Sequence, residues 1–163
     1  MTSIYITKSN GRDVLLHAQD IATKMEKEGI KVLRIKLETL AKSKGVTEIM
    51  QTKEYKNNLH YYFEFHFKVD IKNEADQQKL DQVCKKYQAS YAINFLSKNR
   101  KAPLISYRVR GDYDTALDCR NKLHQAFIDY GLTPLVDGTH YEFTIYDTNY
   151  SLDKGMVPDP VIV

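Results

Sequence analysis

The stretch HYYFEFHFKVD at residues 60–70 decides the fold, because apolar and polar side chains alternate along it. A period of two is typical of a β-strand whose two faces meet different environments. One face carries the aromatic and aliphatic side chains of Tyr61, Phe63, Phe65, Phe67 and Val69. The other face carries Tyr62, Glu64, His66 and Lys68. We therefore expect the first face to be buried beneath helices, and we expect any catalytic or ligand-binding side chains of this strand to lie on the second face.

The length and composition of the chain are those of one globular domain. A chain of 163 residues with 42% hydrophobic side chains can bury a core without disulfides. The net charge of +3 gives no indication of a nucleic-acid arm or an acidic tail. Cys84 and Cys119 fall on the apolar stripes of predicted helices, which indicates reduced core thiols and a cytoplasmic location. The sequence shows no signal peptide and no membrane-spanning apolar run, so we expect no membrane partner.

Residues 1–40 have the pattern of a βαβ unit. A strand is predicted at residues 3–7, a helix at 12–28 and a second strand at 31–40. Asn10 is the expected N-cap of the helix, and Gly29 is expected to end it. In the second strand the inward set is Leu33, Ile35 and Leu37, and the outward set is Arg34, Lys36 and Glu38. Residues 41–59 have little periodicity, so we expect a long surface connection with at most one helical turn.

Residues 60–155 have the element order βαββαβ, which is the ferredoxin-like order. After the strand at 60–70 comes a helix capped by Asn73, with Asp76 three residues later, and then strands at 91–97 and 104–110. A helix at 114–130, ended by Gly131, and a strand at 140–148 complete the unit. We predict a single α+β domain over residues 1–163, with a ferredoxin-like core and an additional N-terminal βαβ unit. All three helices are expected on the aromatic side of a mainly antiparallel sheet.

The sheet face away from the helices is predicted to gather many ionisable side chains. An exposed antiparallel face is normally polar, and ion pairs between strands are routine there. Arginine and lysine in such a row can also bind phosphate or carboxylate, and histidine or glutamate can move protons. We assign candidate catalytic roles to Glu64 and His66. The candidate ligand-binding residues are Arg34, Lys36, Glu38, Lys68, Asn99, Arg108, Arg110, Glu142 and Tyr146; Ser106 and Thr144 are predicted on the same face.

These residues leave three functions open. The first is a module that binds a small anionic ligand, either nucleotide-like or phosphorylated. The second is a phosphoester hydrolase or transferase that uses Glu64 and His66. The third is a protein-interaction module without a small ligand, which forms a homodimer or docks a host protein. The sequence has no P-loop, HExxH or nucleophile-elbow motif and no histidine spacing for a metal, so we predict no metal and no cofactor.

Nucleic-acid binding also stays open. Arg108, Arg110 and the basic turn at residues 98–101 could contact a phosphate backbone. Base stacking on an open sheet face needs outward aromatic side chains, and the alternation leaves chiefly Tyr62 and Tyr146 outward.

Two resemblances to known families accompany these patterns. Glu64-Phe-His66-Phe-Lys68 resembles the ExExK strand of the CYTH superfamily of triphosphate-processing enzymes, except that histidine replaces the second acid and the strand is internal. RIKLE (34–38), YFEFHFKV (62–69), LSKN (96–99), YRV (107–109) and IYDTNYSLDKG (145–155) resemble a family of small bacterial and tailed-phage proteins. That family has no established activity, so the resemblance implies no mechanism. The motifs that carry the resemblance include Glu38, Glu64, His66, Lys68, Asn99, Arg108, Asp147 and Asp153. The resemblance therefore gives these residues added weight, without assigning any of them a role.

The segment at residues 156–163, MVPDPVIV, is expected to be extended because Pro158 and Pro160 prevent a helix. It ends in an apolar group at residues 161–163. We expect this group to dock on its own domain or on a second subunit.

Overall fold

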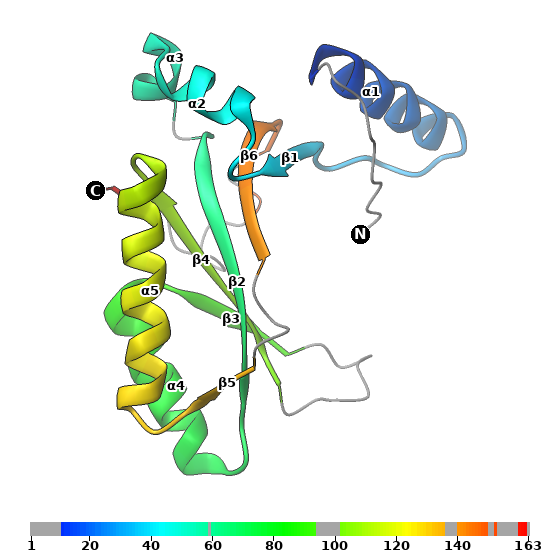
Figure 1. Ribbon diagram of the computed structural model, residues 1–163. Coiled ribbons are helices and arrows are strands. Elements are labelled where there is room, and N and C mark those ends of the chain that lie inside the picture. Colours follow the sequence, from blue (N-terminus) through cyan, green and yellow to red (C-terminus); the bar gives the residue numbers. More distant parts are fainter. Residues whose placement is uncertain are drawn as a thin grey trace.

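The computed structural model of the chain describes residues 11–58, 60–93, 102–135, 140–149, 152 and 160–162 (Figure 1). Its elements are α1 (Gly11–Lys27), β1 (Lys36–Leu40), α2 (Lys44–Met50), α3 (Lys53–Asn57), β2 (Tyr62–Asp70), α4 (Glu74–Tyr87), β3 (Ser90–Ala92), β4 (Leu104–Arg110), α5 (Tyr113–Asp129), β5 (Thr133–Pro134), β6 (His140–Asp147) and β7 (Val161–Ile162). The main path of the sheet runs β1-β6-β2-β4-β3, with β5 paired to β2 and β7 to β4. Every pairing is antiparallel except that of β4 with β7, so the predicted α+β class is confirmed.

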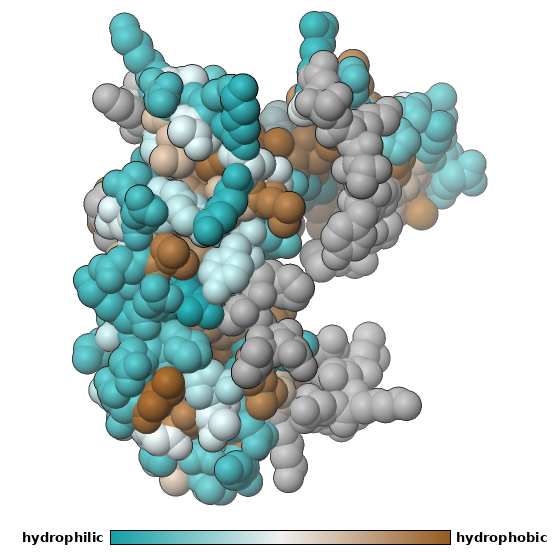
Figure 2. Space-filling view, viewed as in Figure 1, coloured by the Kyte–Doolittle hydropathy of each residue, from teal (hydrophilic) through white to brown (hydrophobic). Residues whose placement is uncertain are grey.

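The central strand β2 has the alternation that the sequence predicted. Phe63, Phe65 and Phe67 are buried on the face that α4 and α5 cover, and the Phe67 and Phe127 rings meet edge-on at 5.7 Å between centroids (Figure 1). Leu80 and Val83 of α4 complete this part of the core. The outer surface of the two helices is mainly hydrophilic, with isolated apolar side chains (Figure 2). The prediction that the aromatic face of β2 is buried beneath helices is therefore confirmed.

Local sequence signals set the ends of these helices. The Asn73 side chain accepts a hydrogen bond of 3.0 Å from the backbone N–H of Asp76, as predicted for the N-cap of α4. Gly131 follows α5 with φ of +74°, a conformation that glycine adopts without the penalty of a Cβ. Asp112 caps α5 by accepting from the backbone N–H of Thr115 at 2.8 Å, so this helix begins slightly earlier than predicted.

The connection before β2 differs from the prediction of a long surface loop. It contains two short helices, α2 and α3, and Ala41 and Val46 are buried in the core. Tyr55 of α3 donates a hydrogen bond of 2.6 Å to the carbonyl oxygen of Gly111, at the end of β4. Helices this short are not stable alone, so these contacts distant in sequence hold them, and local periodicity could not reveal them.

The helix α1 corrects the expectation that all three helices cover the aromatic face. None of its side chains is buried, and the apolar stripe expected along the helix at 12–28, formed by Val14, Ala18, Ile21, Ala22 and Met25, is only half-buried. Figure 1 places α1 beside the β1 edge of the sheet, apart from α4 and α5. The stripe predicted that one helix face is apolar, which is correct, but it carries no information on what covers that face. The N-terminal strand at residues 3–7 and Asn10 lie outside the described residues.

The strand β1 extends the main sheet by pairing with β6, and it is shorter than the predicted strand at 31–40. Leu33 is exposed, although it was predicted to face inward. The pairing register shifts between Leu37 and Glu38, where Leu37 lies opposite Tyr146 and Glu38 lies opposite Thr144. The extra residue of this β-bulge is Ile145 on β6, so the shift interrupts the pairing of the two strands while Lys36 and Glu38 keep the common face that was predicted.

Two short strands occupy the outer edge of β4. β3 pairs with residues 104–106 of β4, and residues 94–97 of the predicted return strand lie outside the described residues. β7 pairs in parallel with Val109 and Arg110, and Val161 packs against the core. The expected docking of the apolar segment on its own domain is thus confirmed for Val161.

Candidate functional site

Four neighbouring strands bring the predicted polar residues together. β2 lies between β4 and β6, and β1 lies outside β6. Glu64 is directly opposite Arg108 on one side and Glu142 on the other. His66 is opposite Ser106, two residues before Arg108 on the same strand. Because paired residues project from the same sheet face, the register gathers these side chains into one cluster.

The centre of the cluster is a buried carboxylate held by two cations. Glu64 accepts from Lys36 Nζ at 2.5 Å and from Arg108 Nε at 3.1 Å. The Glu64 side chain is 4% exposed, which corrects the expectation of an open polar face at this position. Burial alone would raise the pKa of Glu64, but the attraction of Lys36 and Arg108 outweighs it and holds the pKa below its usual value.

Tyr62 completes this buried layer. Its ring lies 5.5 Å from Lys36 Nζ and 5.0 Å from Arg108 Cζ, measured to the ring centroid, and both separations suit cation–π contacts. The sequence placed Tyr62 on the correct face but predicted it to be outward, whereas it is fully buried. Burial is the main reason that the pKa of its hydroxyl is raised.

Two half-exposed carboxylates form the rim of the cluster. Glu38 contacts Lys36 Nζ at 2.5 Å and is 30% exposed, and Glu142 Oε2 lies 3.5 Å from His66 Nε2 and is 33% exposed. Burial raises the pKa of Glu38, and Lys36 offsets only part of that effect. The contact with His66 is the main reason that the pKa of Glu142 is lowered. On its other side, His66 Nδ1 lies 3.1 Å from the Ser106 hydroxyl.

Two predicted arginines have partners outside the cluster. Arg34 forms an ion pair with Asp147 through two of its guanidinium nitrogens: Nε donates to Oδ1 at 2.9 Å, and Nη2 contacts Oδ2. Arg110 donates to the backbone carbonyl of Tyr55 and packs over the Tyr55 ring at 5.3 Å. Tyr55 was not selected as a site residue, and the family resemblance emphasised Asp147 without giving it a role, because nothing local in the sequence links either residue to these arginines.

The other predicted ligand-binding residues are not part of the cluster's contacts. Lys68 is exposed two residues beyond His66 on β2. Tyr146 is half-buried opposite Leu37, at the β-bulge. Asn99 lies outside the described residues.

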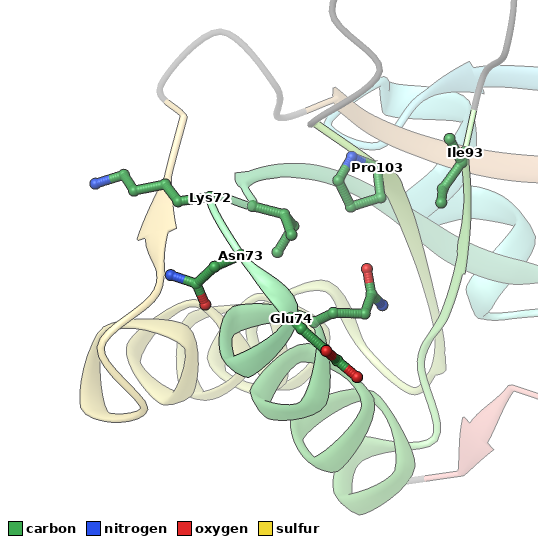
Figure 3. A pocket seen from close by; sticks show the side chains of 7 residues that line it. Lys72, Asn73, Glu74, Ile93 and Pro103 are labelled. Atoms are coloured by element: carbon green, nitrogen blue, oxygen red, sulfur yellow. The ribbon is translucent and has the colours of Figure 1, made fainter.

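A separate hollow of about 380 Å³ lies at the start of α4 (Figure 3). Ile93 and Pro103 border it, whereas the Lys72 side chain extends away from it. It shares no lining residue with the Glu64 cluster and brings together no set of acid, base and nucleophile. We therefore take the Glu64 cluster as the candidate site.

Within the described parts of the chain, no three histidine, cysteine or acidic side chains are arranged to hold a metal ion. None of the helices described is both long and apolar enough to cross a bilayer. The comparisons with known proteins found no matching family model, no matching curated protein and no matching solved structure. The two family resemblances of the sequence therefore stay predictions.

Proposed function

We propose that the chain binds a small anionic ligand, phosphorylated or nucleotide-like, at the cluster around Glu64, Lys36 and Arg108. The observation that carries this proposal is the convergence of two cations on one buried carboxylate. The buried layer formed by these three residues holds one positive charge in excess of its negative charge. An excess charge in a region poorly accessible to water attracts a counter-ion more strongly than a solvated surface charge does.

One rim carboxylate, Glu38, occupies the position that such a counter-ion would take, because it neutralises Lys36 from the solvent side. Glu38 is far more exposed than Glu64, so an incoming phosphate displaces it without opening the core. Glu142 contacts His66 instead and is not displaced. Phosphate carries more charge than one carboxylate and accepts several hydrogen bonds, which favours the exchange.

The proposal is tested by titrating inorganic phosphate and adenosine monophosphate into the protein at low ionic strength, with calorimetric detection. Glu38→Gln removes the competing carboxylate and is expected to tighten binding about tenfold, which corresponds to about 1.4 kcal/mol. Lys36→Met is expected to weaken binding by at least that factor. The control is Glu48→Gln, since Glu48 contacts only the exposed Lys44 at 3.9 Å among the ion pairs described. Absence of binding by wild type, or weaker binding by Glu38→Gln, would contradict the proposal.

We also infer a ferredoxin-like arrangement for the segment from β2 to β6 and an intracellular location. The element order β2-α4-β3-β4-α5 followed by β6, and the spatial order β6-β2-β4-β3, support the first inference. Two free thiols, Cys84 and Cys119, support the second, since reduced cysteines are typical of a reducing compartment.

A further inference from the structure

Three side chains on adjacent strands form a hydrogen-bonding chain at the solvent side of the cluster. Ser106 on β4 lies 3.1 Å from His66 Nδ1, and Glu142 on β6 lies 3.5 Å from His66 Nε2. Neutral His66 that carries its proton on Nε2 donates toward Glu142, which leaves Nδ1 to accept the Ser106 proton. A serine hydroxyl, an imidazole and an orienting carboxylate in this order are the components of an activated nucleophile.

We propose that Ser106 is a nucleophile that accepts the phosphoryl group of a bound phosphomonoester, with His66 as its general base. This inference rests on the proposed function, because it takes the anion bound beside Lys36 and Arg108 to be the phosphoryl group that reacts. Glu142 is a positioning residue that acts through His66. Glu64, which the sequence suggested as a catalytic residue, is instead the counter-ion of the two cations, since both of its oxygens are engaged by them.

The reaction proceeds in two balanced steps. In the first, Ser106 Oγ attacks phosphorus while its proton passes to His66 Nδ1, the bond from phosphorus to the ester oxygen breaks, and the departing oxygen takes the proton from His66. In the second, a water oxygen attacks the phosphoserine, gives a proton to His66 Nδ1, and releases inorganic phosphate as Ser106 Oγ regains its proton. The sum is hydrolysis of a phosphomonoester to an alcohol and phosphate, without any other reactant.

The neighbouring cations suit the charge of this reaction. Arg108 lies two residues after Ser106 on β4, on the same sheet face, and shares Glu64 with Lys36. Positive groups fixed beside a transferring phosphoryl group stabilise the charge that develops on its oxygens. Because Glu64 fixes the positions of both cations before any ligand arrives, little reorganisation is required.

The test uses p-nitrophenyl phosphate as substrate and intact-mass spectrometry of acid-quenched protein to detect a phosphoryl adduct. Wild type is expected to release p-nitrophenol and to carry an adduct that peptide mapping locates at Ser106. Ser106→Ala should neither release p-nitrophenol nor carry the phosphoryl adduct, while it still binds phosphate in calorimetry. His66→Asn should lower kcat by about 10²–10⁴, the usual contribution of general-base catalysis. Glu142→Gln should lower kcat without weakening phosphate binding, which separates positioning from binding.

The matched control is Ser90→Ala, because Ser90 lies directly opposite Ser106 on β3 and is one strand farther from His66. Its turnover should equal that of wild type. Phosphate binding without turnover or adduct would refute the role of Ser106 as a nucleophile but would leave the proposed anion binding intact. Turnover that survives in Ser106→Ala, or hydrolysis of p-nitrophenyl acetate alone, would also overturn it. Absence of phosphate binding by wild type would instead refute the proposed function.

Discussion

The substitution Glu64→Gln measures how much the charge of Glu64, shared by Lys36 and Arg108, contributes to the free energy of unfolding. Glutamine keeps the size of the side chain but removes the negative charge that Lys36 and Arg108 share at 2.5 and 3.1 Å. Breaking a buried ion pair by removing one partner costs about 3–5 kcal/mol, because it leaves an uncompensated charge in the interior. For a domain of this size each kcal/mol lowers Tm by about 2–4 °C, so the variant should melt roughly 6–20 °C below wild type.

The pH dependence of that difference gives a second check. The pKa of Glu64 is lowered in the folded protein, so its stabilising contribution is complete above the unfolded-state value near 4.5 and is lost as the pH falls through the folded-state pKa. The gap in unfolding free energy between wild type and Glu64→Gln should therefore be constant from pH 7 to about 4.5 and narrow below it. Urea denaturation followed by circular dichroism at several pH values measures this gap.

The control for this series is Glu48→Gln, which removes an exposed carboxylate and should change stability by less than about 0.5 kcal/mol. A loss below 1 kcal/mol for Glu64→Gln would refute the reasoning, because the two cations would then be stable without their counter-ion. A gap that widens below pH 4.5 would refute the assigned direction of the pKa shift.

Two further predictions concern the core and the edge of β4. Phe65→Ala should cost about 3–5 kcal/mol in urea denaturation, because the ring is buried and meets Tyr141 edge-on at 5.7 Å; a cost below 1 kcal/mol would show that this face is not the core. Deleting residues 160–163 removes the β7 pairing and the packing of Val161, so Tm should fall by a few degrees, as expected for about 1–2 kcal/mol, with no change of mass in light scattering. An unchanged Tm would contradict the docking of this segment.

The sequence was sufficient to predict the elements whose signals are local. The alternation at Phe63, Phe65 and Phe67 identified the buried face, and Asn73 identified the start of α4. The strand at 104–110 has the predicted bounds. In each case the deciding contacts are within the element or follow directly from its periodicity.

The candidate site was only partly predictable, for a physical reason. A period of two assigns a residue to a face but does not say what covers that face, so the burial of Glu64 and Tyr62 could not be inferred. The bulge after Leu37 depends on the pairing of β1 with β6, which is not encoded in either strand alone. Arg34 and Arg110 lie on predicted polar positions, yet partners distant in sequence hold them away from the cluster.

The pairing of β1 with β6 has a consequence for how the chain is made. Arg34 and Asp147, which join the two strands at one end, are 113 positions apart in the sequence. At a synthesis rate of about 5–20 residues per second, the first strand waits roughly 6–23 s on the ribosome before its partner exists. From the completion of β2 until β6 is made, the edge of β2 that β6 covers is also bare, and an unpaired edge of a hydrophobic strand is a template for association with other chains. Translation products that stop before residue 140 lack β6 and should therefore aggregate, whereas chains that include β6 cover this edge of β2.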